Sequence, residues 1–183
     1  MILLAGDASF RVERSAASKL GPVRGVALSA DQKTLYTWGG SLQLWSLPGL
    51  KPRKLAEGYF SEGGCLVDVD QDGMEDLILQ EGPGLGRLVW RKAPEWEPVV
   101  IDTGVKMHDC IAATLFGRQG FLMIHRHMQV RFYEPDKAGK HWARREIYSF
   151  YTPSQQAGLL LSDINKDGLN DIVAGNYWIR SPE

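Results

Sequence analysis

The sequence predicts an all-β fold in a single domain spanning residues 1–183, a β-propeller of about four four-stranded blades. Twenty glycines and nine prolines are spread between short apolar runs, a pattern typical of many short strands joined by turns. An aromatic residue also recurs within similar apolar segments, at Trp45, Trp90, Phe132 and Trp178. A strand-rich period of ~40 to 50 residues is typical of propeller blades.

The period divides the chain into four repeats. Cys65 and Cys110 occupy equivalent positions 45 residues apart, in agreement with this division. The repeats span residues 23–56, 59–102, 105–149 and 158–183. Alternating apolar residues and turns predict strands at 26–28, 35–38, 42–47 and 53–56 in the first repeat, and further fourth strands at 96–101 and 142–148.

One predicted strand stands apart from the repeats. Residues 9–16 alternate as a single exposed strand, whereas the fourth repeat lacks a fourth strand. We therefore expect residues 9–16 to complete a blade, because an unpaired strand edge invites pairing. Three arrangements remain open: a four-bladed ring closed within one chain, a homodimeric ring in which two chains exchange these strands, or a piece of a longer propeller.

Two nine-residue loops are rich in acidic residues and share one pattern. Residues 68–76 read Asp-Val-Asp-Gln-Asp-Gly-Met-Glu-Asp, and residues 163–171 read Asp-Ile-Asn-Lys-Asp-Gly-Leu-Asn-Asp. Oxygen ligands at alternate positions let a short loop curl around a hard cation such as Ca²⁺, and the glycine permits the sharp turn. The last acid falls at position nine, and both flanks resemble strands, so a strand-loop-strand site is expected. The competing interpretation is a solvated acidic turn.

Each loop is predicted to bind one Ca²⁺ through the side chains at positions one, three, five and nine and the main-chain carbonyl at position seven. The first loop offers more carboxylates, so it should bind Ca²⁺ more tightly. Mg²⁺ should substitute poorly because it requires a tighter octahedral shell. The predicted ligands are Asp68, Asp70, Asp72, Met74 and Asp76 in the first loop and Asp163, Asn165, Asp167, Leu169 and Asp171 in the second.

The corresponding segments of the other two repeats differ. Residues 29–33 contain a single acid, Asp31. The third repeat has Ala113, Leu115, Gly117 and Phe121 where the first loop has its acids. We expect no metal in either segment.

The two loops resemble those of FG-GAP or VCBS repeats, the calcium-loop β-propeller repeats also found in integrin heads. The resemblance implies that Ca²⁺ binds between the first two strands of a blade. It also implies a ring of about seven or eight blades, which favours an open four-blade arc, either as a homodimeric ring or as half of a longer chain. An extracytoplasmic or secreted location follows from the resemblance alone. The apolar residues 1–6 lack a basic flank and do not make a complete signal peptide.

The cysteines and the repeated aromatic residues are expected to be structural. Neighbouring blades diverge outward, so Cys65 and Cys110 are interpreted as two buried free thiols too far apart to bridge. One aromatic residue at the same position of every repeat is interpreted as a core residue between blades, because a ligand site does not need the same residue in each copy.

Two functional classes remain open. A net charge of −1 gives no broad basic face for nucleic acid or anionic lipid, and no apolar run approaches the ~18 residues that span a membrane. The first class is a non-catalytic, calcium-stabilised module that binds a protein or glycan. The alternative, also suggested by the resemblance, is a carbohydrate-active lyase or dehydratase with histidines at the propeller axis. His125 and His127 are interpreted as facing one side of a strand and, with His108, are the candidate cluster; the fourth histidine is His141.

Overall fold

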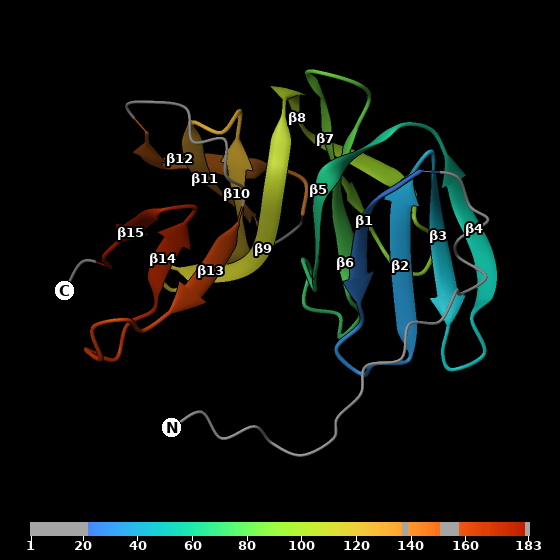
Figure 1. Cartoon of the computed structure of the whole chain (residues 1–183), viewed down its shortest axis with the longest axis horizontal. Helices are drawn as coiled ribbons and strands as arrows, with labels where there is room; N and C mark the ends of the chain where they lie inside the picture. The colour runs from blue at the N-terminus through green and yellow to red at the C-terminus, as the bar shows by residue number, and fades with distance from the viewer. Residues whose placement is uncertain (1–21, 137–138, 151–157, 182–183) are drawn as a thin grey trace, which may run out of the picture.

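The computed structural model describes residues 22–136, 139–150 and 158–181, and in them the regular structure is entirely β (Figure 1). Fifteen strands form four antiparallel sheets, and within each sheet the strands are hydrogen-bonded in chain order. The all-β prediction is confirmed. The predicted strand at 9–16 lies outside the described residues.

The first three sheets have four strands and the last has three. The first sheet contains β1 (Val23–Leu28), β2 (Thr34–Gly39), β3 (Ser41–Ser46) and β4 (Lys51–Glu57). The second contains β5 (Phe60–Val67), β6 (Asp76–Glu81), β7 (Gly86–Arg91) and β8 (Pro98–Val105). The third contains β9 (Met107–Leu115), β10 (Arg118–His125), β11 (Gln129–Pro135) and β12 (Trp142–Ser149). The fourth contains β13 (Leu159–Ser162), β14 (Asp171–Ala174) and β15 (Tyr177–Ile179).

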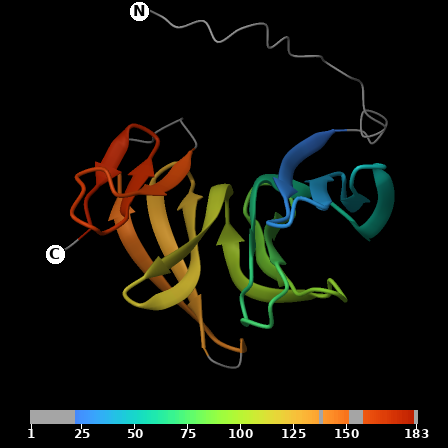
Figure 2. The ribbon, with the colours of Figure 1, turned by 90° about the horizontal axis from the view of Figure 1, so that it is seen from below.

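The sheets follow one another across the molecule in chain order (Figures 1 and 2). Their first strands are neighbours, since β1 contacts β5, β5 contacts β9, and β9 contacts β13. Three apolar clusters fill the spaces between consecutive sheets. The two middle sheets are therefore covered on both faces. This explains why all six residues of β6 are buried and why its apolar run does not alternate with polar residues.

The repeated aromatic residues follow this layering. Trp45, Trp90 and Phe132 are at most 5% exposed, as predicted for core positions. The prediction is wrong for Trp178, which is 53% exposed. Trp178 pairs with Val173 on β14, which in turn pairs with Leu160 on β13, and Leu160 is also exposed. These three residues form a row on the last sheet, where no further described sheet covers them.

Cys65 and Cys110 form a disulfide, so the prediction of free thiols is wrong. Their Cα atoms are 5.3 Å apart. Cys65 lies on β5 and Cys110 on β9, the first strands of adjacent sheets. Although the sheets diverge toward their later strands, equivalent positions on the contacting first strands remain within bridging distance.

Polar side chains also connect neighbouring sheets. Gln80 Oε1 accepts a hydrogen bond of 2.7 Å from the backbone N–H of Met107, and Asp109 Oδ2 accepts one of 2.8 Å from the N–H of Leu159. In the described part of the chain, no sheet closes the series onto the first, and β15 has β14 as its one hydrogen-bonded neighbour. The described residues contain no helix that is long and apolar enough to cross a membrane.

Candidate metal loops

The first predicted loop joins β5 to β6 and is folded around its own acids. The two carboxylate oxygens of Asp68 accept hydrogen bonds from the backbone N–H groups of Asp72 (3.1 Å) and Gly73 (3.0 Å). Asp72 accepts a bond of 2.9 Å from the N–H of Met74. Positions four and six have positive φ, at 60° for Gln71 and 88° for Gly73. The glycine is therefore required for the turn.

The second loop joins β13 to β14 and repeats this pattern at each corresponding position. Asp163 accepts bonds from the N–H groups of Asp167 (3.0 Å) and Gly168 (2.9 Å). Asp167 accepts one of 2.9 Å from Leu169. The φ angles of Lys166 and Gly168 are 62° and 90°. Two segments of different sequence thus adopt one backbone conformation, fixed by the acids at positions one and five.

The acid at position nine anchors each loop to the rest of its sheet. Asp76 accepts a bond of 3.2 Å from the N–H of Val69, at position two, and one of 2.9 Å from the N–H of Ala93. Asp171 accepts corresponding bonds from Ile164 (3.2 Å) and Ser181 (2.9 Å). Both carboxylates are fully buried. Position nine therefore ties the loop to the end of the third strand.

Three carboxylates converge in the first loop. Asp68, Asp70 and Asp76 each place an oxygen within 4.8 Å of the others. One oxygen of Asp70 is buried and accepts no hydrogen bond, and burial raises the pKa of Asp76, as does, more weakly, the negative charge of Asp70. A buried acceptor among converging carboxylates is the environment that a hard cation such as Ca²⁺ relieves. The residues present fit that ion.

The second loop is less concentrated in charge. Within the described residues its acids do not form a comparable group of three. Asn165 stands at position three and donates a hydrogen bond of 2.5 Å from its side-chain nitrogen to Asp167. The amide thus occupies one of the oxygens that the sequence assigns to the metal.

A basic side chain, missed by the sequence reasoning, reaches into each loop. Lys92 bonds to Asp70 and lies 3.2 Å from Asp72, while Arg180 lies 3.5 Å from Asp167. The two carboxylates raise the pKa of Lys92, so the side chain stays protonated. A signal for these residues is present in the sequence, because each follows a repeated tryptophan, Trp90 or Trp178, by two positions.

The residues at position seven lie at the surface of the loops. Met74 and Leu169 are 41% exposed, and their N–H groups hold the acids at position five. The predicted role of their carbonyl oxygens as metal ligands stays a prediction.

The first loop also connects three sheets. Glu75 accepts a hydrogen bond of 2.9 Å from the N–H of Ala30, in the turn between β1 and β2. Gln119, at the start of β10, donates one of 2.9 Å to the main-chain carbonyl of Asp68. The conformation of this loop is therefore coupled to both neighbouring sheets.

The other two repeats form tighter connections at this end of the sheets. Ser29 and Asp31 bond to each other at 2.7 Å, and Asp31 also accepts a bond from the N–H of Lys33. In the third sheet, Leu115 pairs with Arg118 across a two-residue turn. A hairpin stands there in place of a nine-residue loop.

The histidines are arranged differently from the prediction. His125 ends β10, but His127 lies in the following turn with φ of 56°, so the two do not face one side of a strand. His127 instead stacks on His108, with ring centroids 3.2 Å apart, and His108 Nδ1 lies 3.0 Å from Glu62 Oε1. Burial lowers the pKa of His108. His141 is exposed.

No protein-family model matches the chain, and no curated protein matches it significantly. The assignment of the loops therefore depends on their own residues and geometry.

Proposed function

We propose that the protein is a non-catalytic, calcium-stabilised β-propeller module of the FG-GAP/VCBS type that binds a protein or glycan partner. The observation that carries the proposal is the shared geometry of residues 68–76 and 163–171. Both loops use acids at positions one, five and nine to accept the same backbone hydrogen bonds. In the first loop three carboxylates also converge. Carboxylates at these spacings are ligands of the type that Ca²⁺ takes.

The four sheets are proposed to be successive propeller blades. Each is an antiparallel meander in chain order, and the first strand of each contacts the first strand of the next. Apolar clusters between consecutive sheets support the proposal, because blades bury their faces against one another around an axis.

The metal is proposed to act structurally. The first loop is hydrogen-bonded to the first sheet through Glu75 and to the third through Gln119. A bound cation would neutralise Asp68, Asp70 and Asp76 and hold the loop in the conformation that makes these bonds. Its binding free energy would then add to the free energy of unfolding.

Calcium titration of EDTA-treated protein tests this proposal. Isothermal calorimetry should detect two classes of site, and added Ca²⁺ should raise the melting temperature more than equal Mg²⁺. Asp72→Ala should weaken the first site and lower the melting temperature, leaving ligand binding at a remote site intact while the protein stays folded. A melting temperature that does not respond to Ca²⁺ would contradict the proposal, and a natively stable Asp72→Ala protein without any binding activity would assign the metal a functional role.

The proposed assembly is an open four-blade arc completed by a second copy or by further blades of a longer chain. Among the described residues β15 pairs on one edge only, and Leu160 and Trp178 are exposed on either side of the half-buried Val173; both observations support this assembly. Residues 9–16 are the segment proposed to pair with β15.

An extracytoplasmic or secreted location is proposed as well. The disulfide between Cys65 and Cys110 supports it, because disulfides persist in oxidising compartments.

The alternative function is a carbohydrate-active lyase or dehydratase, and one observation favours it. His108 is hydrogen-bonded to Glu62 and stacked on His127 beside the contacting strands β5 and β9, and a histidine oriented by a carboxylate can act as a general base. Incubation with acidic polysaccharides, monitored by ultraviolet absorbance of unsaturated products, distinguishes the two functions. Activity that disappears in His108→Asn would favour the enzyme over the binding module.

A further inference from the structure

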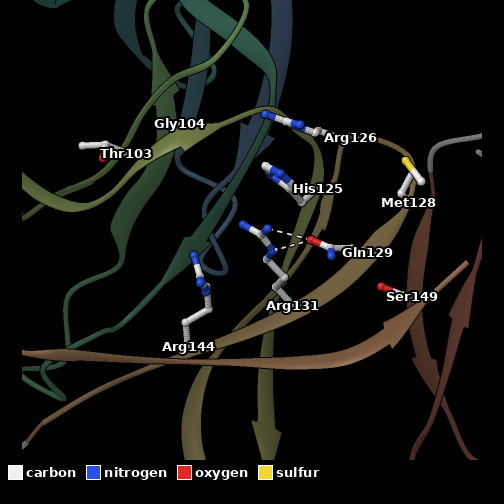
Figure 3. A pocket seen from close by; sticks show the side chains of 9 residues that line it. All are labelled: Thr103, Gly104, His125, Arg126, Met128, Gln129, Arg131, Arg144 and Ser149. Carbon is white, nitrogen blue, oxygen red and sulfur yellow. Dashed lines mark hydrogen bonds between the residues drawn. The ribbon is translucent and has the colours of Figure 1, made fainter.

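A hollow of about 340 Å³ lies at the end of the third sheet that carries the β10–β11 turn (Figure 3). Its walls come from β8, β10, β11 and β12, and three of its side chains are arginines, Arg126, Arg131 and Arg144. The volume lies in the range of small-molecule sites. β10 extends from the neighbourhood of the first metal loop to this hollow, roughly 20 Å away at ~3.3 Å per residue. The hollow is therefore separate from the metal loops.

The arginines of the hollow are only partly neutralised by neighbouring acids. Arg131 directs two nitrogens to the neutral side chain of Gln129, at 3.0 and 2.6 Å. Arg126 forms no ion pair with an acid in the described part of the chain. Arg144 pairs with Asp102 at 3.0 Å, and Asp102 also accepts a bond of 2.9 Å from the hydroxyl of Tyr133. Glu146, the cross-strand partner of Arg131, accepts hydrogen bonds from the Gln129 amide (2.7 Å) and the Ser149 hydroxyl (2.6 Å). Two acids thus stand beside three arginines, which leaves the hollow with a net positive charge.

His125 adds a neutral donor to this surface. Its Nδ1 accepts a hydrogen bond of 3.3 Å from the N–H of Lys106, so the neutral ring carries its proton on Nε2. Figure 3 shows Arg131 and Arg144 extending from their strands toward the His125 side of the hollow, and Arg126 beyond that ring. Burial and the three arginines keep the ring neutral by lowering its pKa to about 4.

The turn that presents these groups is conformationally strained. Arg126 and His127 both have positive φ, at 53° and 56°, in a tight hairpin position where Asn-Gly is strongly preferred. In the described residues these are the one pair of consecutive non-glycine residues with positive φ. A non-glycine residue held in an unfavourable backbone conformation beside a ligand-sized hollow is characteristic of a functional position.

From this geometry we infer that the hollow is a binding site for an oxyanion, a carboxylate, sulfate or phosphate group carried by a small molecule. Arg131 is the principal ligand, because its planar fork matches such oxygens and no acid among the described residues forms an ion pair with it. Arg126 and Arg144 close the site on two sides, and the Nε2–H group of His125 donates to the anion. Binding requires neither metal loop and does not depend on the proposed calcium function.

Calorimetric titration of the whole chain with inorganic phosphate, inorganic sulfate and galacturonate, in calcium-free buffer of low ionic strength, tests the site. Galactose is the uncharged control, and comparison of the three anions identifies which group is preferred. Arg131→Gln should weaken the preferred anion about tenfold. Arg53→Gln, which removes an exposed arginine of β4, should leave the affinity unchanged.

Arg126→Asn is a second variant, in which weaker anion binding would not be caused by a loss of stability. Asparagine tolerates positive φ, so the melting temperature should rise by about 2 to 4 °C while anion affinity falls severalfold. Such opposite changes would support the site. Absence of binding by all three anions at millimolar concentration would overturn the inference, as would equal losses in Arg131→Gln and Arg53→Gln.

Discussion

The ammonium group of Lys92 lies 3.2 Å from the carboxylate of Asp72 and bonds to Asp70 on the same loop. A protonated lysine thus stands among the carboxylates that the sequence assigns to Ca²⁺. Because both cations are attracted by the same oxygens, they compete. In the absence of metal, the lysine lowers the repulsion among the acids. When metal binds, the lysine must move aside or share the carboxylate oxygens with the ion.

Lys92→Met should separate these two effects. Without Ca²⁺ the melting temperature should fall by a few degrees, because the converging acids lose their counter-charge. Calcium affinity at the first loop should rise about threefold to tenfold, measured by calorimetry on EDTA-treated protein. Lys54→Met, which removes a lysine paired with Glu57 on the surface, should change neither quantity. Calcium affinity that fell in Lys92→Met would show that Lys92 supports the metal site and does not compete with it.

Asn165→Asp should give the second loop the acid composition of the first. The new carboxylate replaces an amide that now donates to Asp167, so Ca²⁺ gains an anionic ligand in place of a neutral one. We expect calcium affinity at this loop to rise about tenfold, with a lower melting temperature in EDTA because like charges become adjacent. Asn170→Asp, in the same loop but outside the predicted ligand positions, is the matched control. Equal affinity gains in the two variants would indicate a general charge effect and contradict a coordinated ion.

Local signals made much of this structure predictable. The strands and both loop conformations follow from residue alternation and from acids that bond to backbone groups within nine residues. The contribution of Lys92 and Arg180 could not be predicted in the same way, because it crosses a hairpin of variable length. Ala93, which follows Lys92 and donates to Asp76, lies 17 residues beyond that acid. Ser181, which follows Arg180 and donates to Asp171, lies only 10 residues beyond its acid.

Periodicity identified equivalent positions but not their surroundings. Cys65 and Cys110 were correctly placed as equivalent, yet whether they bridge depends on how closely β5 approaches β9, which no period specifies. Trp178 occupies the same repeat position as Trp90, but its burial requires a neighbouring sheet. The basic hollow combines residues from four strands and the β10–β11 turn. Of these residues the sequence singled out only His125, and it gave no signal that three arginines would gather beside it.

The disulfide should make a large contribution to stability. Cys65 and Cys110 close a loop with a sequence separation of 45, for which chain entropy predicts a stabilisation of about 4 kcal/mol. Urea unfolding with and without reductant measures it. Reduction should lower the free energy of unfolding of the natural protein by a few kcal/mol and leave a Cys65→Ala/Cys110→Ala protein unchanged. If both proteins responded equally, the reductant would be acting elsewhere.

His125 should make the fold sensitive to acid. Its pKa is about 4 in the folded protein and about 6.5 in an unfolded chain, so the unfolded state binds more protons below pH 6.5. The stability due to the neutral ring is complete above pH 6.5 and is lost as the pH falls toward 4. Between pH 7 and 5 this loss amounts to about 2 kcal/mol.

Urea unfolding of His125→Asn at pH 7 and pH 5 isolates this contribution. The asparagine oxygen can still accept the N–H of Lys106, but the side chain does not titrate. The variant should lose about 2 kcal/mol less than the natural protein over this pH interval. Other titrating groups, including Asp102, His108 and His127, are common to both proteins and cancel in the comparison. Parallel pH profiles would mean that folding does not lower the pKa of His125.

The exposed row on the last sheet leads to a prediction about assembly. Leu160 and Trp178 are 55% and 53% exposed, and they flank Val173 on one face. Burial of such a row against a second copy is favourable by roughly 25 cal/mol per Å² of apolar surface. For the homodimeric ring, light scattering should give twice the 20.4 kDa of one chain, and Trp178→Glu should return the mass to that of one chain.

Two further proteins make the assembly test decisive. Leu85→Glu changes an equally exposed leucine in the turn between β6 and β7 of the second sheet and should remain dimeric. A chain without residues 1–16 should dissociate like Trp178→Glu, because the strand proposed at 9–16 is then missing from the ring. A half of a longer propeller would instead give monomers in every case, with Trp178 available to bind a separately supplied partner segment. A stable monomer in which residues 9–16 pair with its own β15 would contradict both arrangements and establish a closed four-bladed ring, since that pairing covers the β15 edge within one chain.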